Sequence, residues 1–273
     1  MPSNTEITVA QLGRLVGLPT APVIIDVRTE DDFAADRQML PAGRRRSHAN
    51  VADWGPALAG RSVVVVCQKG HKISQGVAAW LRLQGVAAET LEGGFAAWRD
   101  SGGLLFSEVA LPPRDAAGRT VWVTRARPKV DRIACPWLIR RFIDPDAAFL
   151  FVGASEVEGV AAAFGAAPFD IDGAFWSHRG EGCTFDTMIE EFGLRSPMLD
   201  RLAVIVRAAD TARLDLSPQA AGFLAASLGL SRMYREDLQQ LDAGMLLYDA
   251  FYRWCRDAVE ETHNWPAGQQ RQG

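Results

Sequence analysis

Cys67 is the residue in this sequence best placed to act as a nucleophile. It ends the apolar run 61–67, and five loop residues follow it: Gln68, Lys69, Gly70, His71 and Lys72. We expect a helix to begin near Ile73, and a short loop closing onto a helix N-terminus points backbone N–H groups at one spot. The glycine permits the positive φ that such a cradle requires. Those donors and the two lysines favour a thiolate and can lower a cysteine pKa from about 8.5 to about 3.5–7.5.

Other interpretations of this loop stay open. A cysteine at the end of an apolar strand is often a small buried hydrophobe, although lysines and a histidine have little reason to follow a core strand. A phosphatase-like or arsenate-reductase-like loop would place its cation six residues after the cysteine, where this chain has Ile73. His71 attracts an anion only when it is protonated, and it could equally be a solvated residue with no role.

The elements around this loop alternate between strands and helices. The runs PVIIDVR at 22–28 and RSVVVVC at 61–67 are typical of strands buried on both faces of a sheet. A helix from Ile73 to Gly85 would place four residues on one face: Val77, Trp80, Leu81 and Gln84. A strand in AAETLEGG and a short helix in FAAWRDSG follow. The alternation predicts an α/β domain with a parallel sheet over residues 1–105.

Three segments of this half resemble the rhodanese family. VIIDVRTEDDF resembles its Asp-Val-Arg segment, CQKGHK its active loop, and LEGGFAAW its Gly-Gly…Ala-Trp segment, in the family's order. The resemblance implies that Asp26 and Arg28 fix the domain structure and the active loop. Two departures are visible. DRQMLPAGRRR replaces the usual Gly-His-Ile-Pro-Gly-Ala segment, and the serine expected directly after the loop cation stands one position later, at Ser74.

The rhodanese resemblance also implies a sulfur-transfer mechanism. The Cys67 thiolate would take the outer sulfur of a small anionic donor such as thiosulfate and become a persulfide. A thiophilic acceptor would then remove that sulfur, and the loop amides would stabilise both anionic states. Lys69 and Lys72 would attract the donor, and Gln68, Gly70 and His71 would complete the binding loop. No cofactor is required for this chemistry.

The remaining sequence predicts a mostly helical α+β domain at 120–262, after a linker at 106–119 rich in Gly, Pro and Ala. VWVTRA and AAFLFV favour strands and CPWLIRRFID a helix, and FDIDGAFWSHR favours a hairpin around Asp172-Gly173. Helix starts are indicated by a capping box at Ser155 and Glu158 and by serine-proline pairs at Ser196 and Ser217. A long amphipathic helix should span about 235–261, before a flexible polar tail at 263–273.

Chemistry-bearing residues gather at three places in this second half. Arg132 belongs to a cationic segment at 125–141, which could bind a small oxyanion or form a solvated face with ion pairs. SHRGEGCTFD brings together residue types that bind metals, although its spacing matches no specific metal motif: His178, Glu181, Cys183 and Asp186. Asp210 lies in an apolar helix, where pairing with Arg207 or Arg213 would explain it. A metal ion in this half stays an open interpretation.

Residues 120–258 resemble the C-terminal domain of ChrB-type chromate resistance proteins. The resemblance lies in three long stretches: RPKVDRIACPWLIRRFIDPDAAFLF, PFDIDGAFWSHRGEGCTFD and RAADTARLDLSPQAAGFLAASLGLS. It implies a role in chromate resistance or chromate-responsive regulation, with chromate or another oxyanion as the ligand, and it supplies no catalytic residues. Fuller members of that family have a different N-terminal region, which is linked to regulation.

Composition excludes several classes of function. Residues 1–105 carry 11 Lys+Arg against 10 Asp+Glu, and residues 106–273 carry 18 against 23, so neither half predicts nucleic-acid binding. We expect no membrane span and no signal peptide, and four separated cysteines suit the cytoplasm. The sequence therefore predicts a cytoplasmic sulfurtransferase fused to a chromate-resistance domain. The alternative is an oxyanion-responsive sensor without turnover, whereas a reductase lacks any nucleotide-binding GxGxxG motif.

Overall fold

The computed structural model describes residues 5–262, and the polar tail expected at 263–273 lies outside these residues. The N-terminal half contains a parallel sheet with the strand order β1-β6-β5-β2-β4. Its strands are β1 (Glu6–Ile7), β6 (Ala87–Leu91), β5 (Ser62–Val66), β2 (Val23–Asp26) and β4 (Arg44–Arg45). The predicted α/β domain with a parallel sheet is confirmed.

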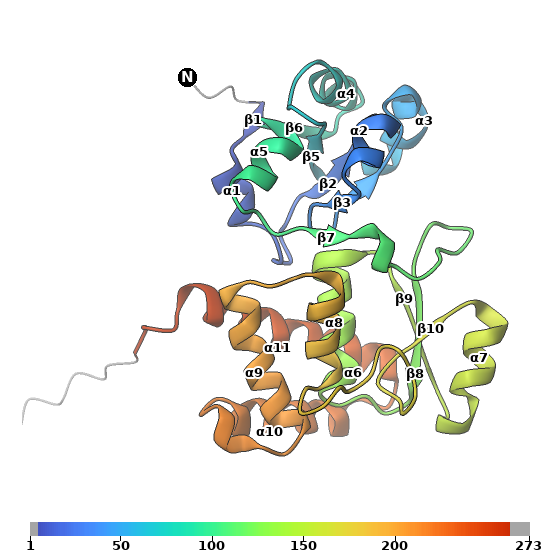
Figure 1. Ribbon diagram of the computed structural model, residues 1–273, viewed down its shortest axis with the longest axis vertical. Coiled ribbons are helices and arrows are strands. Elements are labelled where there is room, and N and C mark those ends of the chain that lie inside the picture. Colours follow the sequence, from blue (N-terminus) through green and yellow to red (C-terminus); the bar gives the residue numbers. More distant parts are fainter. Residues whose placement is uncertain (1–4, 263–273) are drawn as a thin grey trace, which may run out of the picture.

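The central strands β2 and β5 are buried on both faces. Ile24, Val64 and Val66 pack into one apolar cluster, whereas their strand neighbours Val63 and Val65 pack into another. Five helices supply the cover: α1 (Val9–Gly13), α2 (Glu30–Ala35), α3 (Val51–Trp54), α4 (Lys72–Leu83) and α5 (Gly94–Asp100). Figure 1 shows α3 and α4 on one side of the sheet and α1 and α5 on the other. Burial on both sides explains why these strands lack polar alternation.

Helix α4 follows the expected span but not all of the expected face. Val77 and Leu81 are buried against the sheet, as predicted, whereas the Trp80 side chain is 45% exposed. The chain leaves the helix through Gly85, whose φ is +80°, a left-handed conformation that commonly ends helices at glycine.

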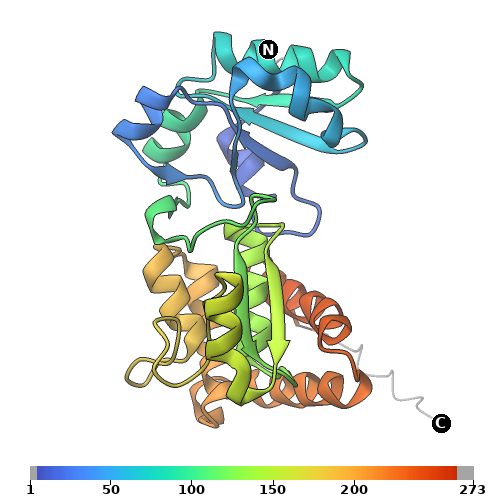
Figure 2. The same cartoon turned by 90° about the vertical axis from the view of Figure 1, so that its right-hand side faces the viewer.

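The segment expected to be a linker begins with a strand. β7 (Phe106–Ser107) pairs antiparallel with β3 (Gln38–Met39), and Phe106 is buried. A short 3₁₀ turn at Glu108–Ala110 follows. The first residues of the 106–119 segment are therefore fixed to the N-terminal half, and Figure 2 shows this segment crossing between the two halves.

The C-terminal half has its own parallel sheet, with the order β10-β8-β9. Its strands are β8 (Val121–Arg125), β9 (Ala148–Val152) and β10 (Ala167–Pro168). The helices are α6 (Asp131–Leu138, continued by a π-helical turn at Ile139–Ile143), α7 (Val157–Phe164), α8 (Thr184–Phe192), α9 (Pro197–Asp210), α10 (Ala220–Met233) and α11 (Asp237–Asp257). Helix α7 covers one face of the sheet and the others gather on the opposite face (Figure 1), which confirms the helix-rich domain.

Three local predictions in this half are wrong and one is confirmed. Ser155 lies inside a 3₁₀ turn at Ala154–Glu156, and α7 begins without a side-chain cap, so the capping box does not form. The hairpin around Asp172-Gly173 is absent, because β10 pairs parallel with β8 instead of folding back on a following strand. Ser196 caps α9 by accepting a hydrogen bond from Leu199 N, as predicted, whereas α10 begins three residues after Ser217.

One apolar cluster runs through both halves. Leu12 and Trp98 of the N-terminal half belong to the same buried cluster as Trp137, Phe142 and Tyr252 of the C-terminal half. Two polar contacts join the same surfaces: Ala42 N donates to Phe142 O at 2.7 Å, and Arg44 pairs with Asp146 at 2.8 Å. Within residues 5–262, no helix is both long and apolar enough to cross a membrane.

Candidate functional site

Cys67 lies directly after β5, and its sulfur is surrounded by donors from the loop and from the start of α4. Ser74 Oγ lies 3.2 Å from Cys67 Sγ. Backbone N–H groups of Ser74, Lys69 and His71 also form hydrogen bonds to the sulfur. The loop thus forms a cradle of N–H groups around Cys67, and Ser74, noted in the sequence only as a displaced family serine, contributes its side chain to it.

The cradle lowers the pKa of Cys67 below its ordinary value. Burial acts in the opposite direction and raises it, since the residue is only 5% exposed. Hydrogen bonds from the Ser74 side chain, and then from the three backbone N–H groups, stabilise the thiolate more than burial destabilises it. A cysteine with more thiolate is a better nucleophile near neutral pH.

The loop keeps its shape because it rests on the turn before α5. Phe95 N donates to Cys67 O at 2.9 Å, and Ala96 N donates to Gln68 O at 3.0 Å. Gly94 has a φ of +62°, and a Cβ on it would lie 2.3 Å from Cys67 O. Gly70 has a φ of +73°, and a Cβ there would lie 2.7–2.8 Å from backbone atoms of the same turn. The LEGGFAAW segment therefore fixes the loop, and both glycines are required by close backbone approach.

The charged side chains of the loop face solvent. Lys69, His71 and Lys72 are exposed, and no ion pair to any of them occurs within the described chain. Gln68 is half-buried, with its Oε1 atom shielded and without a hydrogen-bond partner in residues 5–262. The two lysines are thus free to attract an anion toward the cradle.

Asp26 and Arg28 form a buried ion pair beneath this turn. Arg28 Nη2 lies 2.6 Å from Asp26 Oδ2, and both residues are 2% exposed. The guanidinium also donates to Asp36 O and Gln38 O, and it stacks 3.7 Å from the centre of the Phe95 ring. The ion pair therefore acts on the loop through Phe95, whose backbone N–H holds Cys67 O.

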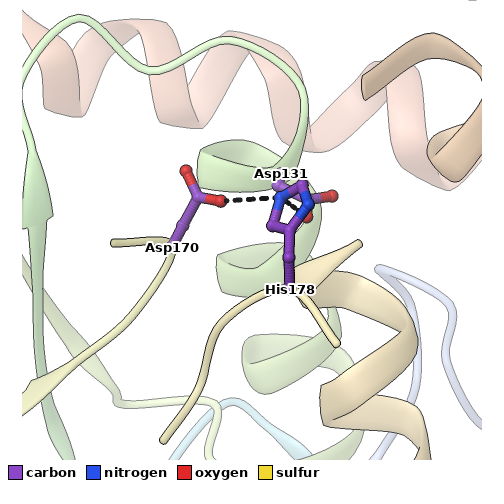
Figure 3. Close-up of side chains that lie close together, drawn as sticks. All are labelled: Asp131, Asp170 and His178. Carbon is purple, nitrogen blue, oxygen red and sulfur yellow. Dashed lines mark ion pairs between the residues drawn. The ribbon is translucent and has the colours of Figure 1, made fainter. Parts of the chain in front are cut away.

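A second group of chemistry-bearing residues lines a cavity of about 540 Å³ in the C-terminal half. Asp131 begins α6, Asp210 ends α9, Asp170 follows β10 and His178 lies in the loop before α8. His178 Nε2 lies 3.2 Å from Asp210 Oδ2, 3.5 Å from Asp170 Oδ1 and 3.7 Å from Asp131 Oδ2. In Figure 3 the His178 ring is joined to both the Asp131 and the Asp170 carboxylates.

Asp131 is the most buried member of this cluster, at 1% exposure. Its Oδ2 accepts hydrogen bonds from Thr184 N at 2.5 Å and Phe185 N at 3.3 Å, the first N–H groups of α8. Burial, followed by repulsion from Asp210 and Asp170, raises the pKa of Asp131 well above its usual value. Burial and Asp170 likewise raise the pKa of Asp210.

Cationic side chains stand at one side of the cavity. Arg132 Nε lies 3.2 Å from Asp170 Oδ2, and Arg125 Nη2 lies 3.5 Å from the same oxygen. Lys129 also lines the cavity and is exposed. With exposed Asp172, the cavity wall therefore combines four carboxylates with three cations and an imidazole.

Only some of the candidate site residues predicted in this half lie together in the structure. His178, Asp210 and Arg132 meet at the cavity, whereas exposed Glu181 pairs with Arg213 at 3.2 Å. Cys183 is buried at the start of α8, and burial, together with the Asp131 charge, raises the pKa of its thiol.

The expected pairing of Asp210 with an arginine is wrong. Arg213 is engaged by Glu181, and Arg207 binds Asp186 through contacts of 2.9 and 3.0 Å. Asp210 instead lies against His178, and its Oδ1 accepts a hydrogen bond from Asp131 N at 3.3 Å.

Sequence reasoning missed Asp131 and Asp170 altogether. The signal available for them was their position beside apolar segments, with Asp131 at the start of α6 and Asp170 after β10.

Comparison with known proteins assigns each half separately. Residues 8–101 match the family model of the rhodanese-like domain, and residues 122–255 match that of the ChrB C-terminal domain. Protein ChrB of Cupriavidus metallidurans is 36% identical over 146 residues, a match that covers 52% of this chain and 43% of that protein. The matched part of this chain thus spans less than half the length of this relative.

Solved structures similar to the chain cover its N-terminal part. A rhodanese-like domain protein from Staphylococcus aureus has 28% identity and a TM-score of 0.31, over 34% of this chain and 90% of that one. A rhodanese-related protein from Thermoplasma volcanium has 19% identity and a TM-score of 0.32, over 37% and 95%. From the two family matches, the chain joins a rhodanese-like domain at residues 8–101 to a ChrB C-terminal domain at residues 122–255.

Proposed function

We propose that the protein is a sulfurtransferase that carries sulfane sulfur as a persulfide on Cys67. The observation that carries this proposal is the cradle of N–H groups and the Ser74 hydroxyl around the Cys67 sulfur. The match to ChrB supports a chromate-resistance context for the activity. Because chromate reduction consumes thiols, a persulfide-forming domain beside a ChrB domain would serve thiol repair.

The transfer consists of two displacements. The Cys67 thiolate attacks the outer sulfur of thiosulfate, the S–S bond of the donor breaks, and sulfite leaves with the bonding electron pair. An acceptor such as cyanide or a thiolate then attacks the outer sulfur of the persulfide and leaves Cys67 as a thiolate again. The N–H groups of Lys69, His71 and Ser74 stabilise the negative charge on sulfur at each stage.

Mass spectrometry of the full-length protein after exposure to thiosulfate tests this proposal. We expect one added sulfur atom on the peptide that contains Cys67, its loss after addition of cyanide, and its absence in Cys67→Ser. Cys255→Ser is the matched control, because Cys255 is buried in α11 and burial raises its pKa to about 11. A protein that gains no sulfur, or gains it equally in Cys67→Ser, would exclude the proposed activity.

A second candidate function is a response to chromate or a similar oxyanion without turnover. It is favoured by the cationic side of the C-terminal cavity, where Arg125, Lys129 and Arg132 line a volume large enough for a small anion. Calorimetric titration with chromate would show saturable binding that Lys129→Gln weakens. Heat changes that do not saturate, or that Lys129→Gln leaves unaltered, would count against this candidate.

A further inference from the structure

We propose that the C-terminal cavity binds a divalent first-row transition-metal ion through Asp131, Asp170 and His178. These three side chains come from α6, from the segment after β10 and from the loop before α8. Sulfur transfer at Cys67 does not involve them, so this site is a function of the C-terminal half by itself.

The spacing of the ligand atoms suits a metal ion. One atom from each of the three residues can be chosen so that all lie within 4.8 Å of one another. His178 Nε2 is 3.5 Å from Asp170 Oδ1 and 3.7 Å from Asp131 Oδ2. Ligands that bind a metal at about 2.0–2.2 Å lie roughly 3–3.5 Å apart, so small movements would close the site. Figure 3 shows the imidazole beside both carboxylates, as a shared ion requires.

An unpaired buried oxygen points independently to a missing cation. Asp131 is 1% exposed, and its Oδ1 atom has no nitrogen or oxygen donor in residues 5–262, where the one further side-chain contact of the carboxylate is with the Cys183 thiol. Its Oδ2 is already occupied by the two N–H groups at the start of α8. A buried carboxylate oxygen without a partner is costly, and no arginine or lysine lies within ion-pair distance of Asp131 in the described chain. A metal ion would supply the missing positive charge.

The arginines that line the cavity do not neutralise all of its carboxylate oxygens. Arg125 and Arg132 pair with the Oδ2 atom of the Asp170 carboxylate, and Arg125 also donates to the backbone Asp170 O at 3.0 Å. The Oδ1 atom of Asp170 faces His178 and accepts from Thr184 Oγ1 at 2.9 Å. The Asp131, Asp170 and Asp210 carboxylates line the same cavity, so their negative charges repel one another. A bound cation would remove that repulsion. Asp210, whose Oδ2 lies 3.2 Å from His178 Nε2, borders the three ligands.

The donor set narrows the class of metal. Carboxylate oxygens and one imidazole nitrogen suit Mn²⁺, Fe²⁺ or Zn²⁺, whereas Ca²⁺ and Mg²⁺ prefer oxygen alone. Because the cavity is open on one side of the cluster, coordination positions would remain for water or an anionic ligand.

Metal titration of the full-length Cys67→Ser protein tests the site without interference from the reactive thiol. Mn²⁺ binding is followed by electron paramagnetic resonance and Zn²⁺ binding by calorimetry. We expect one ion per chain, with affinity for at least one of the two metals lowered at least tenfold in Asp131→Asn and in His178→Gln. Asp172→Asn is the matched control, because Asp172 is an exposed carboxylate in the same cavity wall; we expect it to bind as the parent does.

Three results would each overturn the proposed metal site. If neither metal binds at a ratio of one per chain, or if Asp172→Asn weakens binding as much as Asp131→Asn, the proposed site is wrong. His178 is 42% exposed, so His178→Gln should fold even if the buried Asp131 variant does not. Unchanged affinity in a folded His178→Gln protein would by itself overturn the assignment.

Discussion

Replacing Ser74 with alanine should raise the pKa of Cys67 by about one unit. The change removes the Oγ atom that lies 3.2 Å from the sulfur and leaves the three backbone N–H donors in place. A hydrogen bond to a charged group contributes about 1.5–3 kcal/mol. Ser74 Oγ also lies 3.1 Å from His71 O, to which it donates when the sulfur is protonated, so forming the thiolate gives up that bond. The net effect is therefore near the lower limit, about 1.5 kcal/mol, which corresponds to about one pH unit.

The rate of alkylation by iodoacetamide as a function of pH measures this change. The thiolate is the reacting form, so the rate falls as pH drops through the Cys67 pKa, and that midpoint should move to higher pH in Ser74→Ala. At a pH below both midpoints the variant should react about tenfold more slowly, since one pH unit changes the thiolate fraction by that factor. Mass spectrometry of the Cys67 peptide separates this reaction from those of the buried cysteines.

Ser62→Ala is the matched control, because Ser62 is exposed at the start of β5, the strand that leads to Cys67. It should leave the midpoint unchanged. An unaltered midpoint in Ser74→Ala, or an equal shift in Ser62→Ala, would refute the conclusion that the Ser74 hydroxyl stabilises the thiolate.

Two further variants test two separate contacts: that of Gly94 with the Cys67 loop, and that of the buried Asp249 carboxylate with Arg141 and Trp137. Gly94→Ala should slow alkylation of Cys67 and lower the melting temperature more than Gly85→Ala does, because both glycines have positive φ but only Gly94 lies against the loop backbone; equal losses would contradict this account of the turn. Asp249→Ala should lower the free energy of unfolding by about 3–5 kcal/mol in urea titration, because it leaves Arg141 and the Trp137 indole N–H without their buried acceptor. A loss below about 1 kcal/mol would show that water replaces the carboxylate.

The N-terminal half could be predicted because its signals are local. The strand before Cys67, the glycine in the loop and the start of the helix follow one another in the sequence, and their types determine the local geometry. Ser74 was visible, but its contact with the sulfur depends on how α4 turns after the loop. A sequence pattern does not contain that angle.

The cavity of the C-terminal half could not be predicted in the same way. Asp131 and Asp170 are separated by the rest of α6 and by β9, α7 and β10, and they meet only because β8, β9 and β10 pair in register. The hairpin prediction at Asp172-Gly173 failed for a related reason. Gly173 does adopt a positive φ, as a turn requires, but the strand before it already has a parallel partner. Turn chemistry specifies a reversal of the chain, not the strand that it will join.

The apolar cluster shared by the two halves has a consequence for dissecting this protein. Leu12 and Trp98 of the N-terminal half belong to the same buried cluster as Phe142 and Tyr252 of the C-terminal half. A fragment cut between the halves would therefore expose large apolar side chains to water. Such fragments would be prone to precipitate, so an isolated rhodanese-like fragment without activity would say little about the intact chain. Calorimetric melting of the intact chain should accordingly give one transition, with both halves lost together.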